Sequence, residues 1–302
     1  GIVKINQFSD FNETEENKIK IGIVQPNIAQ QMKRGKKYRQ KIVKILYKSV
    51  ESLRDKGCNI ILYPETVLPR RLMKYPEIRS LVRSIAKNSD ITLIGGKFDE
   101  DKRIYNTIFI VDKNGEVVNK YKKKHLVLFG EYVPFQGFLA ELFKRIDLTD
   151  NLSKNENVEV FDIGSCVLGI NICSENYYPY LSREFTLKGA TLLTTHSNDA
   201  WCDGLSYPYQ HFIMNVFRAV ENRKYLAVSG NTGISGVISP TGKIIKQTKD
   251  SEQTAFEETV YTNSYITIYD RIGDLFVWLC GAYCFCLFIF GIILPWLKKR
   301  IR

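Results

Sequence analysis

The sequence predicts an α/β domain, in which a sheet is covered by helices, followed by one transmembrane helix. β-rich apolar runs alternate with segments whose apolar residues recur at helical spacing, and this order is typical of α/β domains. Residues 275–297 contain no charged side chain. A helix of that length rises about 34 Å, which is enough for a hydrocarbon core of ~30 Å.

Composition indicates a globular protein with an anionic partner. The chain has 302 residues, 44% of them hydrophobic and 25% charged, with a net charge of +11. No nucleic-acid motif is present, so we expect a membrane surface rather than nucleic acid as the partner. The chain begins with Gly1 and shows no signal peptide, and we expect it to be part of a longer product.

Cysteine and histidine usage argues against disulfides and metal. The seven cysteines are irregularly spaced, no CxxC pair occurs, and only three histidines are present. We therefore expect no disulfide framework, no zinc site and no cofactor.

The first part of the chain reads as a linker followed by alternating strands and helices. Residues 1–17 are polar and acidic and predict a linker, and residues 18–270 predict the catalytic domain. Apolar periodicity and turn residues then predict the strands 18–27, 58–66 and 91–98, and the helices 36–56 and 76–87.

The second part adds a hairpin, further strands and two helices. Asn114-Gly115 joins two β-rich runs within 104–125 and is a strong hairpin signal. After an irregular excursion we expect the helices 138–146, 179–188 and 207–222, and the strands 158–164, 166–173, 190–199, 225–231, 234–245 and 265–270.

The C-terminal segment predicts the orientation of the domain. Trp278 and Trp296 lie near the two ends of the apolar run, and the basic tail 298–302 follows it. Basic residues favour the cytoplasmic side, so the C-terminus should be cytoplasmic and the large domain outside. A buried core helix is the alternative, but the run is long and uniformly apolar for one.

Three residues at expected strand ends could perform nucleophilic chemistry together. Cys173 would be the thiolate, Glu65 could take its proton, and the Lys123 ammonium could stabilise the thiolate and an oxyanion. Each alone has an ordinary explanation. An exposed Glu or Lys is usually solvated, and a Cys after apolar residues is usually a small buried hydrophobe.

The combination resembles the carbon–nitrogen hydrolase (nitrilase) superfamily, whose sites join Glu, Lys and Cys in that order. Within it the resemblance is close to the apolipoprotein N-acyltransferases, a family of bacterial membrane enzymes. The stretches that carry it span most of residues 19–297: VQPNIAQ, YPETVLP, YKKKHLVLFGEYVP, GINICSE, TTHSNDAW, and the run from YQHF to SPTG.

The resemblance implies a nitrilase-like αββα sandwich and a role for each site residue. Glu65 would be the general base, Lys123 the oxyanion stabiliser and Cys173 the nucleophile, with Glu131 and Glu175 as supporting carboxylates. Lys123 is favoured over its neighbours because strand alternation places residues 122 and 124 on the opposite face.

Some positions depart from the family pattern or allow two interpretations. Ser174 stands where the family has an aromatic residue, and Leu128 stands where it has Pro. We expect Ser174, Asn198 and Trp201 to contact substrate, although the SNDAW segment is as easily explained as an Asx-type turn. His211 and Gln210 are expected to cap or anchor a helix.

The implied reaction is acyl transfer in two steps. Cys173 would take a fatty acyl group from a membrane phospholipid, and the α-amino group of an apolipoprotein's diacylglyceryl cysteine would receive it. The enzyme would lie in the bacterial inner membrane with its catalytic domain on the periplasmic side. The alternatives are a membrane-anchored nitrilase-type amidase that hydrolyses a C–N bond, and an inactive domain that binds lipid or a partner.

Overall fold

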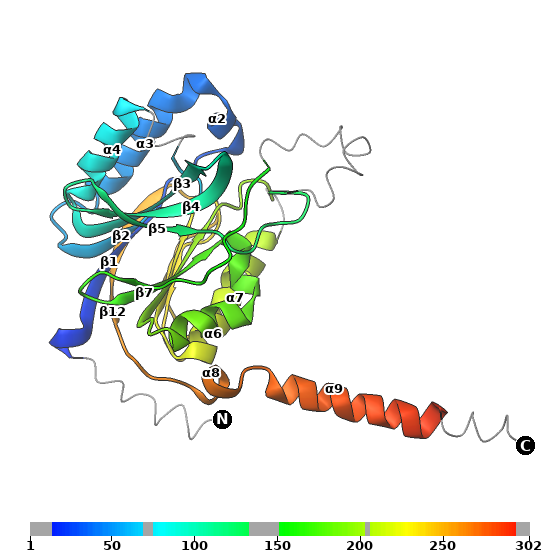
Figure 1. The fold of residues 1–302 in the computed structure, drawn as a ribbon. Helices are drawn as coiled ribbons and strands as arrows, with labels where there is room; N and C mark the ends of the chain where they lie inside the picture. Colours follow the sequence, from blue (N-terminus) through cyan, green and yellow to red (C-terminus); the bar gives the residue numbers. More distant parts are fainter. Residues whose placement is uncertain (1–13, 69–74, 133–150, 203–205, 294–302) are drawn as a thin grey trace, which may run out of the picture.

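Two six-stranded sheets form the centre of the molecule (Figure 1). The computed structural model describes residues 14–68, 75–132, 151–202 and 206–293. The first sheet has the order β12 (Thr254–Tyr261), β1 (Lys18–Gln25), β2 (Cys58–Leu62), β3 (Ser89–Glu100), β4 (Arg103–Asp112), β5 (Val117–Lys122). The second sheet has the order β11 (Ile244–Gln247), β10 (Gly236–Ile238), β9 (Leu226–Gly230), β8 (Leu192–Ser197), β7 (Val167–Ile172), β6 (Phe161–Asp162).

Both sheets are mixed, with parallel strands in the centre. β1, β2 and β3 run parallel, as do β7, β8 and β9, whereas the outer strands pair antiparallel. The carboxyl ends of neighbouring parallel strands meet at one edge of a sheet. The topology therefore brings the residues that follow β2, β7 and β8 to the carboxyl-end edges of the two sheets, where a site can form.

Helices cover the outer face of each sheet, which makes four layers (Figure 1). α3 (Arg39–Glu51) and α4 (Pro76–Ala86) bury their apolar faces on the first sheet, and α6 (Pro179–Leu187) and α7 (Tyr207–Asn222) cover the second. The nitrilase-like α/β sandwich is confirmed. The short elements are η1 (Glu15–Asn17), α2 (Gln30–Arg34), η2 (Lys36–Tyr38), η4 (Cys173–Tyr177) and α8 (Ile268–Ile272).

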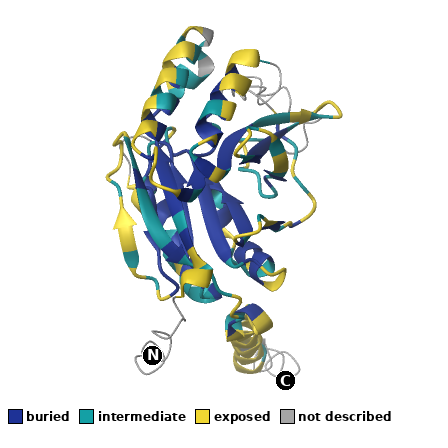
Figure 2. Cartoon of the chain, turned by 90° about the vertical axis from the view of Figure 1, so that its left-hand side faces the viewer, coloured by how far each residue is buried: buried dark blue, intermediate teal, exposed yellow. Residues whose placement is uncertain are grey.

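The inner faces of the two sheets share one apolar core, which is dark blue in Figure 2. Buried polar groups also join the sheets directly. The Ser229 hydroxyl donates to the Val24 carbonyl at 2.9 Å, and His196 Nδ1 donates to the Tyr63 carbonyl at 2.7 Å. Burial lowers the pKa of His196 to about 4, so its ring is neutral and serves as a structural link. These contacts fix the sheet edges that hold the site.

In the C-terminal third, one sequence prediction is wrong and one strand was missed. Residues 265–270 were expected as a strand, but α8 begins there because Thr267 and Asp270 form a capping box: Thr267 Oγ1 accepts from the Asp270 backbone N–H at 2.9 Å. The edge strand β12 was not predicted at all, since its polar face interrupts the apolar pattern. The expected helix 138–146 lies outside the described residues.

The apolar C-terminal segment forms a helix that leads away from the sandwich (Figure 1). α9 spans Leu275–Phe288 and continues as the π-helical turn η5 (Ile289–Ile293). Within the described ranges, none of the helices has both the length and the apolar character needed to cross a membrane. The prediction of one transmembrane helix over 275–297 is thus not confirmed. The α-helical bonding ends at Phe288, and residues from 294 onward are outside the description.

Candidate active site

Cys173 is the first residue of η4 and lies at the sharp turn where β7 ends. Its backbone φ is +52°, in the left-handed region that a non-glycine residue adopts only at a cost, and its side chain is 3% exposed. The turn resembles a nucleophile elbow, because it presents one side chain at the carboxyl end of a buried strand. The sequence prediction that a strand delivers Cys173 to a sheet edge is confirmed.

The Cys173 thiol is not ionised by its surroundings alone. Burial raises its pKa well above the ordinary value, and the Glu65 carboxylate adds to this, whereas Lys123 acts in the opposite direction. A thiol in this state becomes a nucleophile only when a neighbouring base removes its proton.

Glu65 lies in the loop after β2 and is 6% exposed. The next residue, Thr66, has a φ of +47°, and this bend turns the loop across β3. Gly95 makes the close approach possible, since a Cβ there would lie 2.3 Å from the Pro64 carbonyl oxygen and 2.7 Å from the Glu65 Cα. The backbone of β3 therefore sets the position of the carboxylate.

Lys123 directly follows β5 and carries a buried ammonium group. Its Nζ lies 3.4 Å from Glu65 Oε1 and 3.0 Å from Glu131 Oε2. Burial lowers the pKa of Lys123, but these two carboxylates outweigh it and leave the pKa raised, so the group stays cationic. Lys122 instead pairs with Glu100 and Lys124 Nζ donates to a backbone carbonyl, as the strand alternation predicts.

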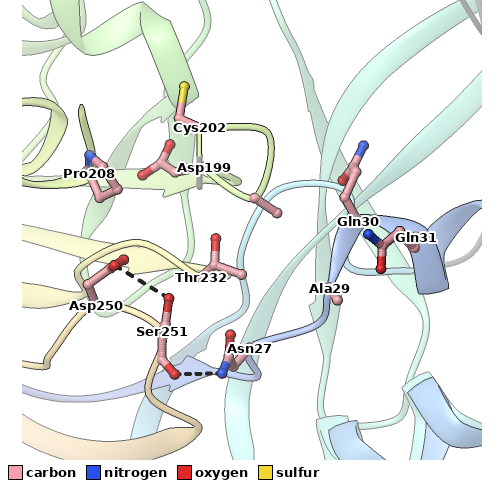
Figure 3. A pocket seen from close by; sticks show the side chains of 11 residues that line it. Asn27, Ala29, Gln30, Gln31, Asp199, Cys202, Pro208, Thr232, Asp250 and Ser251 are labelled. Atoms are coloured by element: carbon pink, nitrogen blue, oxygen red, sulfur yellow. Dashed lines mark hydrogen bonds between the residues drawn. The ribbon is translucent and has the colours of Figure 1, made fainter. Parts of the chain in front are cut away.

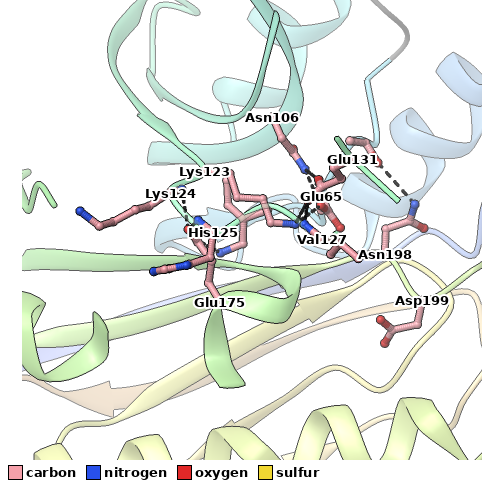
Figure 4. A network of polar contacts seen from close by, with 12 residues as sticks. Glu65, Asn106, Lys123, Lys124, His125, Val127, Glu131, Glu175, Asn198 and Asp199 are labelled. Carbon is pink, nitrogen blue, oxygen red and sulfur yellow. Dashed lines mark hydrogen bonds and ion pairs between the residues drawn. The ribbon is translucent and has the colours of Figure 1, made fainter. Parts of the chain in front are cut away.

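Asn106 on β4 joins the two carboxylates that flank the lysine (Figure 4). Its Nδ2 donates to Glu65 Oε1 at 2.6 Å and to Glu131 Oε1 at 2.8 Å. Burial favours the neutral form of Glu131, yet Lys123 and the hydrogen bonds outweigh this and lower its pKa. We call these four residues the lysine cluster: Glu65, Asn106, Lys123 and Glu131. The sequence interpretation missed Asn106, whose signal was one amide inside an apolar strand.

Glu175 is fully buried and binds backbone rather than substrate. Its carboxylate accepts N–H groups of Lys124 at 2.7 Å, His125 at 3.1 Å and Ile172 at 2.8 Å, as well as the Tyr121 hydroxyl at 3.1 Å. Burial raises its pKa to about 7, although the N–H groups act in the opposite direction. Glu175 thereby ties the segment of Lys123 to the elbow of Cys173.

The three residues expected to contact substrate differ in their surroundings. Trp201 is 57% exposed and packs on Tyr207 with ring centroids 5.2 Å apart. Ser174 is half-buried beside the nucleophile. Asn198 is buried, and its amide is used between loops, because it donates to Thr66 Oγ1 at 3.4 Å and accepts from Asn231 Nδ2 at 2.8 Å. Substrate contact by these three stays a prediction.

A second polar pair reaches Cys173 from the other sheet. Asp199 follows β8, and His211 lies in the second turn of α7, with Nδ1 2.9 Å from Asp199 Oδ1. The donor atoms of Cys173, Asp199 and His211 all lie within 4.8 Å of one another. His211 is thus no helix cap, but its bond to Asp199 anchors α7 to the loop after β8. Sequence spacing gave no sign of this cluster, because the fold assembles it.

A cavity of about 180 Å³ borders the pair on the Asp199 side (Figure 3). Two carboxylates, Asp199 and Asp250, line it, together with hydroxyl, amide and thiol side chains such as Thr232, Gln30 and Cys202. None of the described lining residues is cationic. The cavity therefore favours neutral or cationic groups over anionic ones.

Sequence comparison decides the family. Residues 20–263 match the model of the family described as carbon-nitrogen hydrolase. The chain belongs to the carbon–nitrogen hydrolase family. Membership agrees with the two-sheet sandwich described above.

Among curated carbon–nitrogen hydrolases, similar proteins carry the name apolipoprotein N-acyltransferase. The one from Geobacter metallireducens is 32% identical over 273 residues, which cover 87% of this chain and 52% of that protein. The one from Aquifex aeolicus is 31% identical over 234 residues, or 76% of this chain and 51% of that protein. The chain thus spans about half the length of these relatives.

Solved structures show the same fold at lower identity. An amidase from Nesterenkonia has a TM-score of 0.60 at 19% identity and covers 80% of this chain and 90% of its own. A carbon–nitrogen hydrolase from Helicobacter pylori has a TM-score of 0.61 at 14% identity and covers 82% and 90%. These structures support the sandwich architecture.

Proposed function

We propose that this chain carries the acyl-transfer centre of an apolipoprotein N-acyltransferase. Cys173 takes a fatty acyl group from a membrane phospholipid as a thioester. The α-amino group of an apolipoprotein's diacylglyceryl cysteine then receives that group as an amide. The observation that carries the proposal is the lysine cluster beside a cysteine on a strained elbow, in a chain 32% identical to a protein of that name.

In the first step Glu65 acts as general base toward the Cys173 thiol. Sγ attacks the ester carbonyl carbon, and the charge that develops on the carbonyl oxygen is stabilised by the Lys123 ammonium. When the C–O bond breaks, the leaving alkoxide takes the proton that Glu65 received from the thiol. Glu131 and Asn106 hold Lys123 and Glu65 in place through contacts of 2.6 to 3.1 Å.

We also propose that the apolar C-terminal segment attaches the domain to the inner membrane, with the domain on the periplasmic side and the C-terminus in the cytoplasm. Large apolar side chains on α9 are strongly exposed, among them Phe276 at 74% and Trp278 at 75%. Such a surface favours a lipid environment. Attachment would raise the effective concentration of lipid-anchored substrates at the site.

A trapping experiment tests the proposal. The chain is mixed with phospholipid that carries a labelled acyl group, and the peptide that contains Cys173 is analysed by mass spectrometry. We expect a hydroxylamine-sensitive acyl thioester, release of lysophospholipid, and acylation of an added diacylglyceryl-cysteine peptide. Ammonia release from small amides without any thioester from phospholipid would instead identify a nitrilase-type amidase.

A further inference from the structure

The proton balance of the proposed reaction leaves a role for a second base. In the first step one proton passes from the thiol to the leaving alcohol, and Glu65 suffices. The acceptor amine arrives as an ammonium ion with three protons. One proton remains on the amide nitrogen and one returns to Cys173 Sγ, so that one surplus proton must leave.

The Asp199–His211 pair is buried and held in place next to the nucleophile. Both side chains are only 2% exposed, and Nδ1–H donates to the Asp199 carboxylate at 2.9 Å. Tyr177 stacks on the imidazole with an interplanar angle of 4° and a centroid distance of 5.5 Å, while Tyr207 packs against it at 5.3 Å. The aromatic rings leave the imidazole little freedom to rotate.

Gly233 makes room for the carboxylate of this pair. A Cβ at position 233 would lie 2.2 Å from Asp199 Oδ2. Because this glycine leaves the space, the carboxylate can lie flat beside the ring and hold its Nδ1–H. The position of Asp199 thus selects the tautomer whose lone pair is on Nε2.

The burial of the other ring nitrogen, Nε2, has no structural explanation. His211 Nε2 is buried and has no hydrogen-bond partner within the described part of the chain. An unsatisfied buried polar atom destabilises the folded state. The cost is recovered when a substrate group occupies the space beside Nε2. One nitrogen of the ring belongs to the 4.8 Å cluster with Cys173, so the imidazole lies next to the residue that would carry the acyl group.

We propose that His211 is the general base of the second step, with Asp199 as its positioning residue, and that the group it binds is a primary ammonium. This inference rests on the proposed acyl transfer. The cavity on the Asp199 side of the pair is acidic through Asp199 and Asp250, and it favours cationic groups near the site without being lined by His211 itself. Burial lowers the pKa of His211, but Asp199 outweighs it, and a raised pKa makes Nε2 a better proton acceptor.

The step balances as follows. Nε2 takes one proton from the ammonium group and becomes part of an imidazolium paired with Asp199. The freed lone pair forms the N–C bond with the thioester carbonyl carbon, while Lys123 stabilises the oxyanion. The C–S bond then breaks with its electron pair on Sγ, which receives the second amine proton through Glu65. The imidazolium releases its proton to water once the amide has left.

The test separates charged from uncharged acceptors. Cys173 is first loaded from an activated p-nitrophenyl acyl ester, so that the result does not depend on phospholipid recognition. Transfer is then measured to a peptide with an N-terminal ammonium group and to hydroxylamine, which is uncharged at neutral pH and brings no surplus proton. The variant His211→Gln keeps an amide near Nε2 but cannot accept a proton.

We expect His211→Gln to slow transfer to the peptide about 100-fold, within the range of general-base catalysis, and transfer to hydroxylamine less than about 3-fold. Peptide transfer by the wild type should increase with pH as His211 deprotonates, and the variant should lose this inflection. Asp199→Asn should show the same selectivity at about 10-fold, because it disturbs the tautomer. Equal slowing of both acceptors, or an unchanged pH profile, would overturn the proposal.

Other groups facing His211 are excluded as the source of the inflection. Cys173 carries the acyl group during this step and does not titrate. Burial raises the pKa of Tyr177 and of Tyr207, so both remain neutral. Glu65 is present in both wild type and His211→Gln, so an inflection that is lost in the variant does not come from Glu65. If His211→Gln cannot be loaded from the ester, the comparison of peptide and hydroxylamine transfer in Asp199→Asn tests the inference instead. If the wild type is loaded by the ester but not by phospholipid, the result counts against the proposed function and not against the role of His211.

Discussion

Two polar clusters meet at Cys173, and they differ in how completely their groups are paired. In the lysine cluster, on the first sheet, Lys123 contacts two carboxylates and Asn106 bridges the same two. In the Asp199–His211 pair, from the second sheet, one ring nitrogen is bonded and the other has no hydrogen-bond partner among the described residues. A saturated ionic cluster suits the stabilisation of developing charge, whereas a pair with one free nitrogen suits the transfer of a proton.

The largest predicted effect comes from the residue that both clusters share. Cys173→Ala should abolish thioester formation and reduce overall transfer by about 10⁴-fold or more, as expected for loss of a nucleophile. Radiolabelled acyl transfer to the acceptor peptide measures this. The matched control is Cys58→Ala, a buried cysteine at the start of β2, which should keep activity within about 2-fold. Residual thioester in Cys173→Ala would assign the nucleophile elsewhere.

Removing the cation should affect both steps, unlike removing the imidazole. Lys123→Met leaves Glu65 and Glu131 buried without their counter-ion and deprives each oxyanion of its stabiliser. We expect loading and transfer each to slow by about 10³-fold, the upper range for loss of one oxyanion donor. Stopped-flow loading with the p-nitrophenyl ester measures the first step. Lys122→Met is the control. If Lys123→Met slowed only one of the two steps, Lys123 would not be the oxyanion stabiliser of both.

The raised pKa of the Glu175 carboxyl group should make the free energy of unfolding depend on pH. Its pKa is about 7 when folded and 4.5 ordinarily, so between these values the folded chain binds the proton more strongly than the unfolded chain. Its contribution to the free energy of unfolding is therefore complete below pH 4.5 and falls as pH rises to about 7. The loss is at most about 3.5 kcal/mol, because one pKa unit corresponds to ~1.4 kcal/mol.

Urea unfolding at pH 5 and pH 8 measures this contribution. Glu175→Gln does not ionise, and it should show a smaller decrease between the two pH values than the wild type. Glu184→Gln, which alters a carboxylate with an exposed side chain on α6, should keep the wild-type decrease. Parallel pH dependences for wild type and Glu175→Gln would mean that Glu175 does not ionise in this window.

The smallest expected effect concerns substrate contact outside both clusters. Trp201 is exposed beside Tyr207 and lies close to the Asp199 loop, so Trp201→Ala should raise KM for the acyl donor about 3-fold with little change in kcat. Steady-state kinetics with phospholipid in mixed micelles measure both constants. Phe217→Ala, an exposed aromatic on α7, serves as control. An equal rise in KM for both variants would remove Trp201 from the substrate site.

The sequence predicts the sandwich well because most of its strands and helices carry regular apolar patterns. It also predicts which side chains end the strands β2, β5 and β7, and the structure brings Glu65 and Lys123 to within 3.4 Å of each other. Residues 265–270 were wrongly predicted as a strand, because the capping box of Thr267 and Asp270 starts the helix α8 in spite of the β-branched residues there.

Contacts made between elements could not be predicted in the same way. Asn106 bonds to Glu65 only because β4 pairs with β3, and His211 meets Asp199 only because α7 packs over the end of β8. Neither pairing leaves a local pattern in the sequence. The SNDAW segment drew attention to Asn198, whereas the structure places its neighbour Asp199 beside the nucleophile.

The most direct test of the account is the fraction of Cys173 that is acylated when both substrates are present. This fraction shows whether Glu65 acts in thioester formation and His211 in transfer to the amine. Mass spectrometry of the Cys173 peptide, from reactions that contain phospholipid and acceptor peptide, gives this fraction for wild type, Glu65→Gln and His211→Gln. We predict a low fraction in the wild type, almost none in Glu65→Gln, and accumulation of the thioester in His211→Gln. An equally low fraction in both variants, or acyl groups on a residue other than Cys173, would contradict the account.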